Sequence, residues 1–286
     1  MSEYQYFEFQ AIDRPLTARE MGELRKVSTR ATITPTRFTN HYEWGDFKGN
    51  PSKWMEKYFD AFLYVTNWGA HEFMLRLPKG ALDIKTAKRY CRGESAEARA
   101  KGDCVILEFR SDDENGDNWD DSDDGSGWLS SLITLRRDLA AGDHRALYLA
   151  WLFCVQNREV KGRDTEPPVP PGLGKLSAPL KSFADFLRID TKLIAVAAER
   201  SAQIDDKISA KDLERWIDGL APAEKTALLR RFVTGDEQRL RSEVLRRFQR
   251  TQLTGDAKAS GKPRTAQELL DRVESRAAEN GQKLAS

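Results

Sequence analysis

The chain has 286 residues, 40% of them hydrophobic, which is enough apolar material for two ordinary domains with a core each. Lysine and arginine number 46 and aspartate and glutamate 45, and the formal net charge of +1 argues against a bulk attraction to nucleic acid or anionic lipid. The chain shows neither a signal peptide nor an apolar stretch long enough to span a bilayer, which predicts a cytoplasmic protein that does not enter membranes.

The cysteines are Cys91, Cys104 and Cys154, an odd number with wide spacing. No CxxC pair or Cys/His cluster accompanies them, so metal or redox work is not indicated. We interpret them as buried, reduced thiols and expect no cofactor.

The first elements are strands and a helix in alternation. Large apolar and polar residues alternate over 4–12, which is typical of a strand with one buried face. Thr17 and Glu20 have capping-box spacing and begin a helix. The β-branched residues of 29–34 predict a second strand that resumes through 37–39.

A helix is predicted to begin at Asn50-Pro51, because proline fits the first helical position. Apolar residues at spacings of one, three and four continue this pattern to Leu63. Apolar runs at 71–77 and 103–109 predict two further strands with a short helix over 82–90 between them. The second of these runs has no alternation, which indicates a strand covered on both faces.

Two helices are predicted at 128–140 and 143–160, and the second is apolar nearly all round, as in a buried helix. The whole order of elements predicts an α+β domain over 1–161, in which helices pack against a small sheet. The strand order stays open at this point.

The segment 166–174 reads EPPVPPGLG and interrupts regular structure, because proline fixes φ and lacks an N–H donor. It lies inside a predicted Pro/Gly-rich linker over 162–176. Beyond it we expect an all-α region with a helical bundle over 177–253, a flexible tether over 254–264 and a terminal helix over 265–286. Individual helices are predicted at 178–187, 191–201, 210–220, 222–233, 237–253 and 265–284.

The acidic segment Asp112 to Asp124 is dense in oxygen ligands but fails the register of a calcium loop. A motif that starts at Asp120 has Ser131 at its twelfth position, where a bidentate carboxylate is required. We interpret the segment as a solvated acidic loop. With Trp119 and Trp128 beside it, it is also a candidate docking surface for a basic partner.

The loop after the second strand mixes aromatic and titratable side chains. Trp44 and Phe47 can stack on a planar ligand and belong to the candidate interaction surface. His41, Glu43 and Asp46 are a candidate acid–base set for an enzyme of unknown class. The simpler interpretation is a structural loop whose aromatic residues cover one end of the sheet.

The helix predicted over 237–253 is polarised. Arg239, Arg246 and Arg250 align on one side at 100° per residue, which makes a basic stripe able to bind phosphates of RNA or DNA. A solvated face of a bundle is the ordinary explanation, because acidic residues interrupt the positive field. The opposite side carries Leu240, Val244 and Phe248.

The runs at 3–16, 67–69 and 166–174 resemble a family of uncharacterised bacterial cytoplasmic proteins with no activity assigned. The resemblance covers most of the chain. It implies a bacterial cytoplasmic setting and brings no cofactor or functional residue.

The sequence contains no phosphate-binding glycine motif, HExxH or GxSxG, so the enzyme hypothesis is the least favoured. The leading hypothesis is a non-enzymatic protein-interaction or scaffold protein with a protein partner. The alternative is a nucleic-acid-associated protein that uses the arginine stripe.

Overall fold

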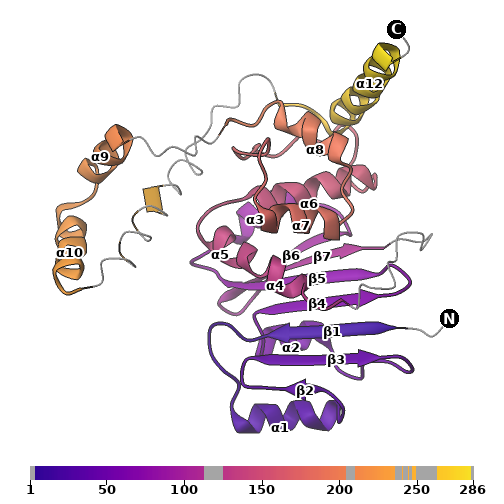
Figure 1. Ribbon diagram of the computed structural model, residues 1–286, viewed down its shortest axis with the longest axis vertical. Helices are drawn as coiled ribbons and strands as arrows, with labels where there is room; N and C mark the ends of the chain where they lie inside the picture. The colour runs from indigo at the N-terminus through magenta and orange to yellow at the C-terminus, as the bar shows by residue number, and fades with distance from the viewer. Residues whose placement is uncertain are drawn as a thin grey trace.

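A computed structural model describes residues 4–112, 125–203, 210–235 and 263–284, together with the single positions 240, 244, 247 and 248. Within these residues an antiparallel seven-stranded sheet has the order β2-β3-β1-β4-β5-β7-β6 (Figure 1). The first part of the chain is therefore α+β, as predicted. The strands are β1 (Gln5–Gln10), β2 (Thr32–Ile33), β3 (Arg37–Tyr42), β4 (Ala61–Thr66), β5 (His71–Pro78), β6 (Ala96–Lys101) and β7 (Cys104–Ser111).

Each face of the sheet has its own hydrophobic cluster, because successive side chains of a strand point to opposite faces. One face packs against α1 (Ala18–Val27) and α2 (Pro51–Lys57). The other face packs against a larger group of helices (Figure 1). These are α3 (Ile84–Tyr90), α4 (Trp128–Leu132), α5 (Thr134–Ala140), α6 (Arg145–Gln156), α7 (Ala178–Phe186), α8 (Thr191–Ala198) and the start of α12 (Ala266–Leu284).

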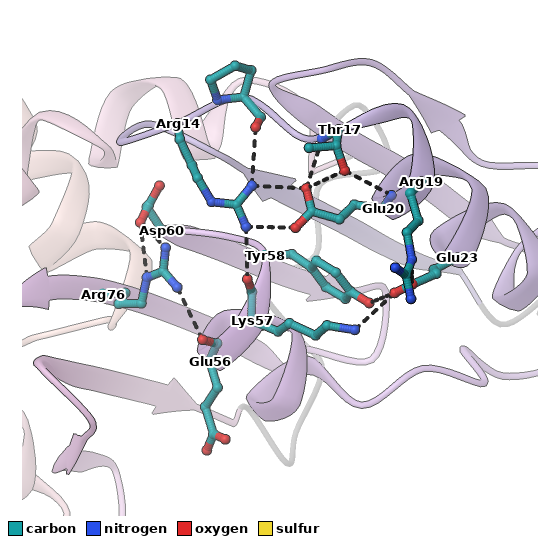
Figure 2. A network of polar contacts seen from close by, with 11 residues as sticks. Arg14, Thr17, Arg19, Glu20, Glu23, Glu56, Lys57, Tyr58, Asp60 and Arg76 are labelled. Atoms are coloured by element: carbon teal, nitrogen blue, oxygen red, sulfur yellow. Dashed lines mark hydrogen bonds and ion pairs between the residues drawn. The ribbon is translucent and has the colours of Figure 1, made fainter.

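The start of α1 confirms the predicted capping box. The backbone N–H of Glu20 donates to Thr17 Oγ1 at 3.2 Å, and the Glu20 carboxylate accepts from the Thr17 N–H at 2.8 Å. Glu23, one turn later, accepts from the hydroxyl of Tyr58 at 2.6 Å and from Lys57 Nζ at 2.9 Å (Figure 2). Polar contacts thus hold α1 against the end of α2.

The helix predicted from Asn50 to Leu63 is wrong beyond Lys57, where α2 ends and a turn leads into β4. Phe62 lies in the cluster under α1 and α2, whereas Leu63 lies in the cluster on the opposite face. Neighbouring apolar residues are required when a central strand is buried on both faces. A helical pattern and a fully buried strand therefore look alike in this stretch.

Strand β6 was not predicted. Its sequence alternates alanine with Glu97, Arg99 and Lys101, a composition without the β-branched residues that mark strands. It pairs with β7 at the edge of the sheet, where charged residues discourage further pairing. Its partner β7 and the preceding strand β5 occupy the positions predicted from their apolar runs.

The Pro/Gly-rich segment forms no helix or strand, as predicted, but much of it is buried. The Tyr90 hydroxyl donates to Pro168 O at 2.9 Å, and the Ser201 hydroxyl donates to Pro170 O at 2.8 Å. Glu166 forms a buried ion pair with Arg264 at 2.8 Å and accepts a hydrogen bond from Tyr148. The segment therefore packs against helices that precede and follow it.

A single hydrophobic cluster contains residues from both sides of this segment, among them Leu149, Phe183, Leu193 and Leu269. The predicted organisation into two domains is therefore not confirmed. The terminal helix is confirmed, and Thr265 with Glu268 forms its capping contacts at 2.7 and 3.2 Å.

Two helices, α9 (Ala210–Asp218) and α10 (Pro222–Val233), lie away from the sheet (Figure 1). Leu240 and Phe248 are buried, and the Phe248 ring lies 5.9 Å from that of Trp216. Burial of these two side chains agrees with the apolar side predicted for 237–253. Most of this stretch, and most of the predicted tether over 254–264, lies outside the described residues.

None of the helices described has both the length and the apolar character that crossing a bilayer requires.

Candidate interaction surface

Several strand ends meet at one end of the sheet. Gln5 at the start of β1 is opposite Tyr42 at the end of β3 and Thr66 at the end of β4. His71 at the start of β5 is opposite Ser111 at the end of β7. The loops that follow these strands must therefore lie together. We call this region the acidic-aromatic end and define it by Glu43, Trp44, Asp46, Tyr64, Trp68, Glu72 and Asp112.

Trp44 projects from the loop after β3, and 79% of it is exposed. Gly45 follows it with a φ of +83°, a conformation that favours glycine. The Gln5 side chain donates to Gly45 O at 3.3 Å and to Asp46 Oδ1 at 3.4 Å. The loop is thus anchored to β1 while the indole faces solvent.

Trp68 lies in the turn between β4 and β5 and is 43% exposed. Asn67 and Tyr4 hold this turn against the start of β1: Tyr4 N donates to Asn67 Oδ1 at 2.9 Å, and Asn67 N donates to Tyr4 O at 3.1 Å. Two tryptophans are therefore exposed on loops anchored to the adjacent residues Tyr4 and Gln5, where β1 begins. Tryptophan is usually highly buried and is enriched at protein interfaces, so its exposure here is informative.

Carboxylates gather around Tyr64 at the same end. Burial raises the pKa of Tyr64 to about 12, and the negative charges of Glu72, Asp46 and Asp112 contribute to this rise. Burial likewise raises the pKa of Glu72, and Asp112 adds to the effect although the guanidinium of Arg110 opposes it. All three carboxylates therefore act on the phenol of Tyr64, and Asp112 also acts on Glu72, so carboxylates gather at this end of the sheet with the guanidinium of Arg110 beside them.

The acidic segment predicted from the sequence continues directly from Asp112. Between 112 and 124 the chain has eight Asp or Glu residues and no Lys or Arg. Residues 113–124, with Trp119, lie outside the described residues. By its sequence this segment adds further carboxylates directly after Asp112.

The other predicted aromatic residues pack inward. The Phe47 ring lies 4.8 Å from Phe7 and 4.9 Å from Trp54, within the cluster under α1 and α2. Trp128 is half-buried, and its ring lies 5.5 Å from that of Phe186. Phe47 and Trp128 therefore pack into the two hydrophobic clusters on opposite faces of the sheet, whereas Trp44 is exposed.

His41, Glu43 and Asp46 are all exposed. The His41 ring stacks on Tyr4 with a centroid distance of 6.2 Å, and Asp46 accepts from Gln5. Catalytic acids and bases usually work in a cavity that excludes water, and exposed side chains lack that environment. This geometry gives no support to the enzyme hypothesis.

Arg239, Arg246 and Arg250 lie outside the described residues, and nucleic-acid binding by this stripe stays a prediction. The neighbouring Arg247 is described, and it pairs with Glu224 of α10 at 2.8 Å.

Sequence reasoning missed Tyr64, Glu72 and Trp68 of this surface, and Trp68 is the exposed aromatic residue among them. The signal was present, since Asn67-Trp68-Gly69 is typical of a turn between two strands. It was hidden because the stretch before it was read as a helix and not as a strand.

In the described parts of the chain, no group of three or more His, Cys, Asp or Glu side chains is arranged to hold a metal ion. Comparisons of this chain with protein-family models, curated proteins and solved structures found no match.

Proposed function

We propose that this chain is a non-enzymatic interaction protein whose acidic-aromatic end binds a basic segment of a partner protein. One observation carries the proposal: the fold brings exposed Trp44 and Trp68 together with the carboxylates of Asp46, Glu72 and Asp112. Such a surface offers aromatic anchors for apolar side chains and negative charge for lysine or arginine.

The two kinds of group have different roles in binding. Burial of an exposed indole contributes most of the affinity, because aromatic anchors near the centre of an interface are the usual hot spots. The carboxylates act over a longer range and raise the association rate, an effect that salt screens. We therefore expect binding that weakens with salt but depends most strongly on the tryptophans.

We also propose a bacterial cytoplasmic setting. The resemblance of the chain to a bacterial family supports it. The thiols of Cys91, Cys104 and Cys154 are all unpaired, which agrees with a reducing compartment.

The test is affinity purification from the native host with three versions of the full chain. The wild type is expected to retain a stoichiometric protein partner, and the double variant Trp44→Ala/Trp68→Ala is expected to lose it. The matched control is Ile12→Ala, because Ile12 is 42% exposed but lies beyond the opposite ends of the strands.

Equal recovery of the partner by the wild type and the double variant would exclude the acidic-aromatic end as the binding surface. Circular dichroism of all three proteins should be the same, because each substituted side chain is already partly or largely in solvent.

A further inference from the structure

The helix α10 displays an apolar stripe to solvent. Leu229, Phe232 and Val233 are 63%, 53% and 81% exposed, and their spacing of three and four places them on one side of the helix. No residue of α10 is buried. A contiguous exposed apolar stripe of this kind marks a surface that binds another molecule.

Basic side chains border this stripe. On a helical projection Arg230 falls next to Val233, and Lys225 falls beside Leu229, one turn earlier, where its Nζ donates to Asp218 O at 2.9 Å. The acidic residue Glu224 projects towards the other side, where it pairs with Arg247. The exposed side of α10 is therefore both apolar and positively charged.

These properties are complementary to those of the acidic-aromatic end, which offers exposed indoles among carboxylates. We propose that α10 of one copy binds the acidic-aromatic end of a second copy. The inference rests on the proposed function and identifies the basic partner segment as part of this same chain. The apolar stripe would pack on Trp44 and Trp68, with Arg230 directed at the surrounding carboxylates.

The contact must form between copies. In Figure 1 the start of β1 lies at the right-hand end of the strands, whereas α9 and α10 lie to the left of the sheet. Because the acidic-aromatic end is built around the start of β1, the two surfaces are far apart within one molecule. Such a contact joins two different surfaces, so a dimer still has one free α10 and one free acidic-aromatic end. Further copies can therefore add to it, and the assembly extends into a filament or closes into a ring.

The decisive experiment uses two variants of the full chain, each altered on one surface. The α10 variant carries Leu229→Asp and Phe232→Asp, and the end variant carries Glu43→Lys and Trp44→Ala. All four positions are exposed, so folding should be retained. The control variant carries Ile12→Ala and Asp103→Lys, which alter comparable exposed positions at the opposite ends of the strands.

Analytical ultracentrifugation at low salt should show concentration-dependent oligomers for the wild type and the control. Each surface variant alone should be monomeric, with self-association weakened about tenfold or more, as expected for loss of an anchor residue. An equimolar mixture of the two variants should form a dimer and nothing larger, because only one intact contact remains. Raising the salt concentration should weaken the association in all of these oligomers, because salt screens the charges at the contact.

A monomeric wild type, or a mixture of variants that stays monomeric, would overturn the inference. So would oligomers of the end variant that match those of the wild type, since they would show α10 pairing with itself. The proposed function is tested separately by binding of a synthetic peptide of residues 220–235 to the full chain. Binding without self-association would leave the proposed function standing. Absence of both would remove the inference about α10, and the affinity purification with Trp44→Ala/Trp68→Ala would then decide the proposed function by itself.

Discussion

Asp60 shows how one side chain holds the turn that replaces the predicted helix. It is fully buried, and its Oδ2 accepts from the N–H groups of Ile12 at 2.6 Å and Asp13 at 2.9 Å. Its Oδ1 accepts from Nη2 of Arg76 at 2.6 Å (Figure 2). Burial alone would raise the pKa of Asp60, but these donors outweigh it and lower the pKa.

Removing this carboxylate should be costly. Asp60→Ala leaves the guanidinium of Arg76 and two backbone N–H groups without their acceptor, and we expect a loss of about 3–5 kcal/mol in the free energy of unfolding. Urea denaturation of the wild type and Asp60→Ala at pH 7 measures this loss. A loss below about 1 kcal/mol would show that water or neighbouring groups replace the carboxylate.

Asp60 should also make the stability of the protein depend on pH in the acid range. A lowered folded pKa means that Asp60 stabilises the fold above its unfolded value of about 3.9 and that this contribution is lost as pH falls through the folded pKa. Stability of the wild type should thus fall more steeply below about pH 4 than that of Asp60→Asn, which cannot titrate there. Parallel curves for the two proteins would contradict this assignment.

At the scale of elements, alanine substitutions at two glycines are expected to change the stability of the protein in opposite directions. Gly22 is exposed within α1, and a Cβ added there meets no atom within 4 Å. Alanine restricts the unfolded chain and favours the helix, so Gly22→Ala should stabilise the protein by about 0.5–1 kcal/mol. Thermal denaturation should show a raised Tm, and a lowered one would mean that α1 tolerates no side chain at this position.

Gly93 lies in the connection from α3 to β6 and serves as the contrasting control. A Cβ added there would lie 2.1 Å from Oε2 of Glu159 and 2.8 Å from Sγ of Cys154. Glu159 is held in place because its carboxylate accepts from the Ser95 N–H at 2.8 Å. Overpacking of this kind costs about 1–3 kcal/mol, so the Tm of Gly93→Ala should fall.

At the scale of the whole molecule, the sheet and the helices beyond the Pro/Gly-rich segment share one core. Phe183 of α7 is fully buried, and its ring lies 5.1 Å from Phe109 of β7 and 6.1 Å from Phe73 of β5. The sheet should therefore depend on α7 for its stability. This is the opposite of what a linker between independent domains implies.

Phe183→Ala tests this dependence. It should lower the free energy of unfolding of the sheet by about 3–5 kcal/mol, the usual cost of removing a buried phenylalanine. Near-UV circular dichroism reports the aromatic residues of the sheet during denaturation. The matched control Lys181→Ala alters an exposed position of the same helix and should have little effect. A sheet transition unchanged by Phe183→Ala would restore the organisation into two domains.

The sequence by itself determined those features that depend on near neighbours along the chain. The capping box at Thr17 is confirmed, and Thr265 caps α12 in the same way, because the hydrogen bonds of both join residues three positions apart. The strands at 71–77 and 103–109 were visible in their apolar runs. The acidic segment and the exposed loop at Trp44 were recognised in the same way, from local composition.

Only the tertiary structure decided the features that depend on distant residues. Phe62 and Leu63 belong to a strand because β1 and β5 pair with that stretch, and β6 is a strand because β7 pairs with it. Backbone pairing supplies free energy that local propensity does not contain, and it overrides weak local preferences. For the same reason, the meeting of Trp44, Trp68 and the carboxylates at one end of the sheet follows from strand register and not from spacing along the chain.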